Sequence, residues 1–233
     1  MGAHIDFTGS RDFLQTLSLF RTLDARELEL IDAATTEQRP AAGTAVYRRG
    51  DPCDGMHVIV LGRVKLALLA RDGAEKVVEI LGPGQSFGEA VMFIDRPYNL
   101  HAEALTNSLL LHIGKQAILE AVEANPAFAR RMLNELAQRQ CRLVADIEGY
   151  TLKNATNRVT AYLLDALEDQ HPVAGQPADV LLAASKSVLA SRLNITREHF
   201  SRILHELSQA GLIRVSGRNI NILDRAGLRQ HSA

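Results

Sequence analysis

Four side chains that could read DNA follow one another in a short segment of the chain. Arg197, Glu198, Ser201 and Arg202 come directly after Thr196, which is a good N-cap for a helix. Arginine can bond guanine O6 and N7 together, and glutamate can accept a hydrogen bond from cytosine N4. The segment predicts a DNA-reading helix for a half-site that contains G·C pairs. The stripe expected to be buried on its other side consists of Phe200, Ile203, Leu204 and Leu207.

The elements on either side of this helix predict a winged helix-turn-helix. A short helix over Ser187–Leu193 precedes it, and a tight turn at Leu193-Asn194-Ile195 joins the two. Downstream, the runs Leu212–Val215 and Ile220–Leu223 predict a β-hairpin. We expect phosphate contacts from the first residues of the short helix and from the hairpin tip, which are Lys186, Ser187, Arg214 and Arg218.

The charge of the chain is divided unevenly between its two parts. Residues 1–150 hold 16 Lys and Arg against 20 Asp and Glu, and residues 151–233 hold 10 against 7. Residues 183–233 alone hold 8 against 3. This local excess of positive charge suits a surface that lies against phosphates.

Composition excludes several other classes of protein. With 46% hydrophobic and 23% charged residues, the chain has the composition of a globular protein. Its start lacks the layout of a secretion signal and no apolar run is long enough to span a bilayer, so we expect a cytoplasmic protein without a membrane partner. Cys53 and Cys141 are too few for a zinc site, and no acid/base or nucleophile pair predicts an enzyme.

Periodicity divides the chain into three predicted domains of an α+β protein. A helical stretch over residues 11–36 is followed by short β-type runs between glycine turns, which predict a small antiparallel barrel or sandwich within residues 1–125. A long helix occupies residues 126–153, and the winged helix-turn-helix domain occupies residues 154–233. The runs expected as strands are Thr44–Arg48, His57–Leu61, Val64–Leu69, Lys76–Leu81 and Leu109–Ile113, and residues 168–179 are expected to form a loop.

The long helix carries the spacing of a coiled coil. Six of its residues recur at alternating intervals of three and four, and one of them is polar, which favours a dimer seam over packing within the chain. The predicted interface consists of Leu133, Leu136, Gln140, Leu143, Ile147 and Tyr150.

Over residues 10–228 these motifs resemble the CRP/FNR superfamily of bacterial transcription regulators. The resemblance rests on GPGQSFGEA at Gly82–Ala90, on the long helix and on TREHFSR at Thr196–Arg202. EAVMFIDRP at Glu89–Pro97 and LKNATNRVTAYLL at Leu152–Leu164 are most similar to the FNR/DNR branch. The resemblance implies a cyclic-nucleotide-binding-type β-roll and an effector-responsive homodimer on a two-fold symmetric DNA operator, with RNA polymerase as a further partner.

The resemblance also implies an effector pocket, whose residues depart from the cyclic-nucleotide pattern. Gly88-Glu89 is retained, but the arginine and hydroxyl expected for the cyclic phosphate are replaced by Asn99-Leu100, and Arg96 comes too early in the turn. A buried phosphate would lack a compensating charge there. This disfavours cAMP as the effector. The helix side of the pocket is expected at Leu136, Leu143 and Val144.

Two other cofactors follow from the resemblance. An FNR-type iron–sulfur cluster needs four cysteines, mostly near the N-terminus, and the first cysteine here is Cys53. A haem that responds to nitric oxide, as in DNR, stays open, with His57, His101 and His112 as candidate ligands. A CO-sensing relative has Cys and His in the strand after the glycine-rich turn, but Phe87–Ala90 contains neither residue. The histidine that precedes the reading helix in DNR-like proteins is replaced here by Arg192.

The predicted mechanism is a population shift between two dimer geometries. An effector in the barrel would press on the long helix near Leu136–Leu143 and alter the hinge around Lys153–Asn157, so that both reading helices fit the operator. The alternatives are a cAMP-dependent regulator, or a cyclic-nucleotide-binding module of another assembly. The second leaves the basic C-terminal region unexplained. Half-sites of the TTGAT type fit Glu198, Ser201 and Arg202, whereas Arg197 favours the TGTGA type.

Overall fold

The computed structural model describes residues 9–169 and 178–231 of an α+β protein. The chain divides into two compact units, which we call the N-terminal unit (Met1–Ala74 and Val78–Cys141) and the C-terminal unit (Glu75–Val77 and Arg142–Ala233). The division passes through a strand, β5 (Glu75–Leu81), and through the long helix α5 (Pro126–Leu152).

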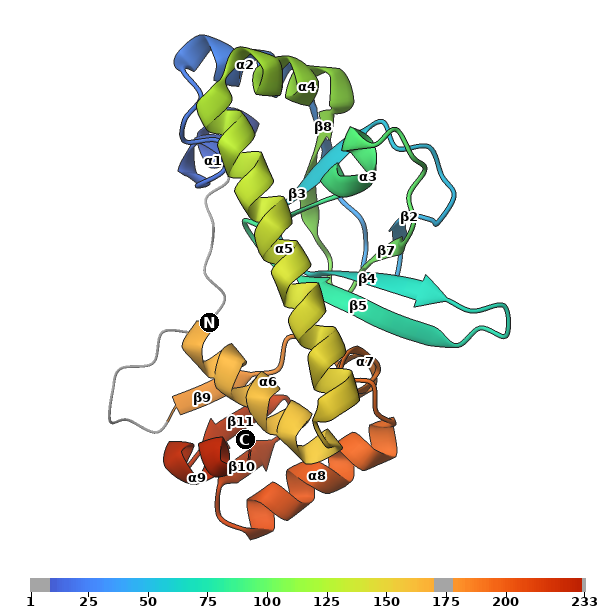
Figure 1. The fold of residues 1–233 in the computed structure, drawn as a ribbon, viewed down its shortest axis with the longest axis vertical. Helices are drawn as coiled ribbons and strands as arrows, with labels where there is room; N and C mark the ends of the chain where they lie inside the picture. Colours follow the sequence, from blue (N-terminus) through green and yellow to red (C-terminus); the bar gives the residue numbers. More distant parts are fainter. Residues whose placement is uncertain (1–8, 170–177, 232–233) are drawn as a thin grey trace. The chain divides into compact units, whose positions relative to one another are not determined.

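Two four-stranded antiparallel sheets form the N-terminal unit (Figure 1). The first has the strand order β1-β8-β3-β6, and the second has the order β2-β7-β4-β5. Within the first sheet, β3 is paired with β8 along most of its length. The strands are β1 (Thr35–Gln38), β2 (Ala45–Tyr47), β3 (Gly55–Leu61), β4 (Val64–Leu69), β5, β6 (Ser86–Phe87), β7 (His101–Ala104) and β8 (Leu109–Gly114).

The core of this unit consists of two clusters of buried side chains, one between the two sheets and one between the first sheet and the helices. Six of the seven residues of β3 are buried, because the strand has apolar neighbours on both of its faces. Gly55 begins this strand where a Cβ atom would lie 2.2 Å from the carbonyl oxygen of Ile113, so only glycine permits the close pairing with β8. Four short helices flank the sheets: α1 (Ser10–Thr16), α2 (Ala25–Ala33), α3 (Glu89–Phe93) and α4 (Lys115–Ala124).

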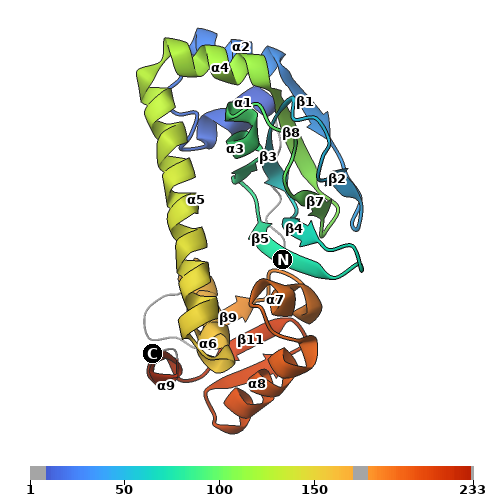
Figure 2. The same ribbon diagram turned by 45° about the vertical axis from the view of Figure 1, so that its right-hand side comes forward.

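A three-stranded antiparallel sheet and four helices form the C-terminal unit (Figures 1 and 2). The strand order is β10-β11-β9, and β10 is joined to β11 by a two-residue turn between Ser216 and Asn219. The elements are α6 (Ala155–Asp169), β9 (Ala178–Leu181), α7 (Lys186–Arg192), α8 (Arg197–Gln209), β10 (Ile213–Ser216), β11 (Asn219–Ile222) and α9 (Arg225–Gln230).

The long helix α5 begins at Pro126, as the sequence indicated, and ends at Leu152. The Asn125 side chain caps it by accepting hydrogen bonds from the backbone N–H groups of Ala127 and Phe128, at 3.1 and 3.0 Å. Its 27 residues correspond to a length of about 40 Å. Phe128 and Met132 bury its first two turns in the core of the N-terminal unit.

Several short elements differ from the sequence-based expectation. Thr35 and Thr36, expected in a helix, begin strand β1, and β6, β7 and α3 were not expected at all. The predicted loop over residues 168–179 was wrong at both ends, because α6 extends to Asp169 and Ala178 begins β9. The middle of that loop lies outside the described residues. Elements of two to five residues carry too little periodicity to be recognised from the sequence.

Candidate DNA-binding surface and effector site

The helix-turn-helix is held together by local signals of its own sequence. Asn194 adopts a left-handed backbone conformation with φ 57°, and this reverses the chain between α7 and α8. The Thr196 hydroxyl accepts a hydrogen bond from the backbone N–H of His199 at 3.2 Å, so it caps α8 as predicted. Ser185 caps α7 in the same way.

One side of α8 is buried and the other is exposed. The predicted stripe is at most 3% exposed, and it packs on the remainder of the C-terminal unit. Arg197, Glu198 and Arg202 are exposed, and Ser201 is half-buried. The Arg202 Nε atom lies 3.8 Å from Glu206 Oε1 with both side chains at least 60% exposed, so solvent screens this pair strongly. The arginine head group therefore stays available to a ligand.

The exposed side of α8 continues beyond the four predicted residues. His205 and Gln209 are exposed, and they follow Glu198, Ser201 and Arg202 at the helical intervals of three and four residues. The His205 Nε2 and Gln209 Nε2 atoms lie 3.0 Å apart. His205 was not predicted as part of this side, although the same helical spacing, continued by one turn, includes it.

The wing places one of its two arginines where it was predicted and the other elsewhere. Arg214 is the second residue of β10, opposite Asn221, so placing it at the tip was wrong, although its side chain is exposed. Arg218 lies in the two-residue turn, and one of its guanidinium nitrogens donates a hydrogen bond to the Leu182 carbonyl at 2.8 Å. This bond ties the wing to the segment that leads into α7. At the start of α7, Lys186 is half-buried and Ser187 is exposed.

Four side chains bind the end of α5 and the hinge that follows it to the helix-turn-helix within the C-terminal unit. The Tyr150 hydroxyl donates to the Arg192 carbonyl and accepts from the Arg192 guanidinium, both at 2.6 Å. Arg192 also bonds Asp146 at 2.7 Å. Arg158 donates to the carbonyls of Leu193 at 2.9 Å and Lys153 at 2.7 Å. The turn of the reading motif is thus bonded to the hinge between α5 and α6.

The predicted dimer seam is largely exposed in the single chain. Leu133, Leu143 and Ile147 are 66%, 38% and 63% exposed. Gln140 is exposed, and Leu136 is half-buried. Tyr150 is half-buried, and its hydroxyl is already bonded to Arg192. The helix therefore presents an apolar stripe to solvent over most of the predicted seam.

The predicted effector site centres on a buried carboxylate. Gly88 adopts a left-handed conformation, with φ 95°, and leads into α3, whose first residue Glu89 is 3% exposed. Glu89 Oε1 is paired with Arg139 of α5, and Arg139 also donates to the Ser86 carbonyl at 2.6 Å and lies 3.2 Å from Glu79. Arg139 was not predicted from the sequence, because the partners of its hydrogen bonds are about 50 residues away in the chain.

Burial raises the pKa of Glu89, and the charge of Arg139 lowers it in part. The second carboxylate oxygen of Glu89 is buried without a hydrogen-bond partner. Two carboxylates, Glu79 and Glu89, therefore lie against the Arg139 guanidinium.

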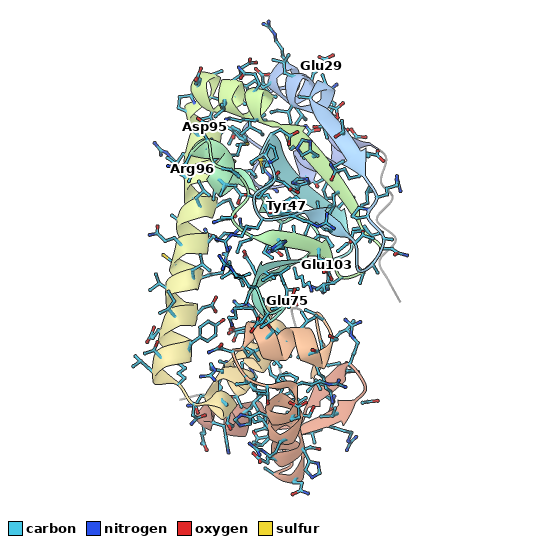
Figure 3. All side chains as sticks on the ribbon, turned by 90° about the vertical axis from the view of Figure 1, so that its right-hand side faces the viewer. Glu29, Tyr47, Glu75, Asp95, Arg96 and Glu103 are labelled. Carbon is cyan, nitrogen blue, oxygen red and sulfur yellow. The ribbon has the colours of Figure 1, made fainter. Side chains whose placement is uncertain are left out.

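The other residues predicted for the effector pocket are more exposed. Asn99 is exposed and Leu100 is half-buried against the core. Leu136 is half-buried one turn before Arg139, whereas Leu143 and Val144 are 38% and 60% exposed. Arg96, labelled in Figure 3 in the segment after α3, is exposed. None of these positions brings a buried cation to the site.

Aromatic and histidine side chains fill the space beside Glu89. The rings of Tyr47, labelled in Figure 3, and Tyr98 are stacked with their centres 3.5 Å apart. His57 is 3% exposed, with its ring centre 4.9 Å from that of Phe87 and 4.8 Å from that of His112. Burial lowers the pKa of His57 to about 3, so the ring is neutral.

Each of the three candidate haem ligands contacts other groups of the protein in this arrangement. The His57 ring is packed against Phe87 and His112, and His112 Nε2 is bonded to Asp54 at 3.1 Å. His101 Nδ1 accepts a hydrogen bond from the Arg49 backbone N–H at 3.4 Å. Within residues 9–169 and 178–231, no group of three or more His, Cys, Asp or Glu side chains could hold a metal ion.

The fold and this surface define a class of protein that combines a unit of two antiparallel sheets, a long helix and a winged helix-turn-helix unit. Residues 37–125 match the cyclic nucleotide-binding domain family, and residues 157–231 match the Crp-like helix-turn-helix domain. Among the described residues, no helix is both long and apolar enough to cross a membrane.

Comparison with known proteins places the chain in a family. It is 30% identical over 209 residues to the probable transcriptional regulator flp of Lacticaseibacillus casei, which covers 88% of this chain and 91% of the relative. It is 25% identical over 209 residues to the CRP-like cAMP-activated global transcriptional regulator of Mycobacterium tuberculosis, covering 88% and 93% of the two chains. The solved structure of FixK2 from Bradyrhizobium japonicum has the same fold, with a TM-score of 0.77, 24% identity and coverage of 85% and 98%. The chain belongs to the CRP/FNR family of transcription regulators.

Proposed function

We propose that the protein is a homodimeric regulator that binds a two-fold symmetric DNA operator through Arg197, Glu198, Ser201 and Arg202. The observation that carries the proposal is α8, a capped helix whose exposed side bears these residues while its opposite side is buried. The first residues of a reading helix contact base edges in the major groove, and the wing and α7 supply phosphate contacts. Two reading helices on half-sites about 34 Å apart would read one symmetric site.

The homodimer part of the proposal rests on the exposed apolar stripe of α5. Leu133 and Ile147 are more than 60% exposed on the same side of one helix, and a partner helix would bury them. Replacing Ile147 by Glu places a charge in this seam. We expect sedimentation velocity to show a monomer, whereas Gln138→Glu, an exposed position on another side of the helix, should stay dimeric.

The DNA-binding part of the proposal is tested by measuring how strongly the protein prefers a symmetric operator over random DNA. Duplexes with two inverted TTGAT or TGTGA half-sites are compared with a duplex of random sequence. Replacing Arg202 by Ala should remove about 1–3 kcal/mol of discrimination for each half-site, while the dimer stays folded. The control is Arg26→Ala, which removes the same charge from an exposed arginine of the N-terminal unit. If the wild-type protein prefers neither symmetric duplex under any effector condition, the proposal is wrong.

The structure favours an effector without a buried anionic group. Arg139 is already shared between Glu79 and Glu89, and Asn99 and Leu100 add no charge for a cyclic phosphate. Isothermal titration with cAMP and cGMP should therefore show no binding at micromolar concentration, and tight binding of either would overturn this part. Haem with nitric oxide is the alternative that the resemblance implies, and it is discarded if added haem gives no shifted Soret band.

A further inference from the structure

The reading side of α8 extends to His205, which lies seven residues after Glu198. Two turns of helix bring the two side chains to nearly the same side, about 10.5 Å apart along the axis. Both are exposed, and α8 lies at the margin of the C-terminal unit in two views (Figures 1 and 2). The major groove is about 12 Å wide. If Glu198 reaches a base edge, a side chain two turns further along the helix reaches the sugar–phosphate edge of the groove.

The surroundings of His205 leave its ring able to bond a phosphate oxygen. One ring nitrogen, Nε2, lies 3.0 Å from the Gln209 side chain, which orients the ring, and the structure gives no bond to Nδ1. The charged groups near it on α8 are Glu198, Arg202 and Glu206, of which Arg202 and Glu206 face each other. Among the described residues of other elements, none forms a hydrogen bond or ion pair with His205.

We propose that His205 is a phosphate-contacting residue whose protonation strengthens DNA binding by this protein. The inference rests on the proposed function and adds a pH response to it. A neutral imidazole offers one N–H donor, whereas the protonated ring offers two donors and a positive charge. Histidine as a residue type changes charge between about pH 5 and 8, so pH is the variable that tests this contact. Since phosphates are present in every sequence, it would strengthen specific and nonspecific binding alike.

Fluorescence anisotropy on the symmetric and random duplexes at about pH 6 and about pH 8 tests the proposal. We expect the dissociation constant of the dimer for every duplex to be about tenfold lower at the lower pH. Each of the two protomers contributes a factor of about three. The slope of log K against log salt should steepen by about 0.9 for each phosphate gained. His205→Gln should lose both responses. His205→Lys carries its charge at both pH values and should bind at about pH 8 as tightly as the wild type does at about pH 6.

The matched control is His199→Gln, which changes the other histidine of α8, a half-buried residue outside the row formed by Glu198, Arg202 and His205. It should keep the pH response. The proposal is overturned if His205→Gln binds with the wild-type pH dependence, or if His199→Gln alone abolishes that dependence. Because the random duplex also reports on His205, this result is separate from operator preference. A protein with a pH response but no preference for symmetric duplexes would refute the proposed function and keep the inference.

Discussion

The two units of the protein use the same side chains in opposite ways. In the N-terminal unit Arg139 is 17% exposed and bonded to Glu89 and to the Ser86 carbonyl, whereas Arg202 on α8 is 66% exposed with one distant partner. Histidine shows the same contrast, because His57 is buried among rings and His205 is exposed. In these two pairs the same residue type is part of the structure at the buried position and available to a ligand at the exposed position on α8.

The physical reason for the contrast is the cost of removing a charge from water. A buried guanidinium must have its partners built into the fold, and these partners then become dependent on it. An exposed guanidinium gains little from its neighbours, so a phosphate or a base edge can compete for it. The difference predicts that equal substitutions affect stability at the bonded arginines and DNA binding at the exposed arginines of α8.

The largest effect is expected from Arg139→Met. This change leaves Glu89, which is 3% exposed, without its cation in the core. Breaking a buried ion pair from one side costs about 3–5 kcal/mol, so the free energy of unfolding in urea should fall by that amount. The matched control Arg202→Met should change it by less than about 0.5 kcal/mol. Equal losses in the two variants would remove the proposed difference between the units.

A smaller loss of stability is expected from Arg158→Met. This substitution tests whether a hydrogen-bonded arginine also stabilises the C-terminal unit. Arg158 donates hydrogen bonds to the carbonyls of Leu193 and Lys153, and methionine keeps the aliphatic stem but loses both bonds. We expect the free energy of unfolding to fall by about 1.5–3 kcal/mol. Arg214→Met, an exposed position on β10, is the control. No loss in Arg158→Met would show that these bonds are replaced by water.

The contrast also explains which parts could be predicted from the sequence. The helix-turn-helix depends on local signals, such as the cap at Thr196, the left-handed Asn194 and the stripe from Phe200 to Leu207, and each of them lies within a few residues of its effect. The triad of Glu79, Glu89 and Arg139 joins three elements, and no spacing rule connects them. Tyr150 shows the same limit, because its heptad position predicted the seam while its hydroxyl bonds Arg192, 42 residues away.

The buried histidine predicts a pH dependence of stability. The pKa of His57 is lowered from 6.5 to about 3 by burial, so below pH 6.5 the unfolded chain binds a proton that the folded chain does not. Its contribution to stability is complete above that pH and is lost as the pH falls from there toward 3. From pH 6.5 to about 5.5 the loss is about 1 kcal/mol. His57→Phe should flatten this part of the curve, and His101→Gln, on β7, should not; equal slopes in both would contradict the assignment.

The smallest effect is expected from Thr196→Ala, which tests whether the exposed side of α8 depends on its local cap. The Thr196 hydroxyl satisfies the backbone N–H of His199, and its loss should lower the free energy of unfolding by about 1 kcal/mol. Because Arg197, Glu198 and Ser201 lie in the first turns, fraying there should also weaken operator binding, whereas binding to a random duplex should change less. Thr196→Ser keeps the hydroxyl and should restore both quantities. A stability loss without any change in operator preference would show that the reading residues are positioned by the buried stripe rather than by the cap.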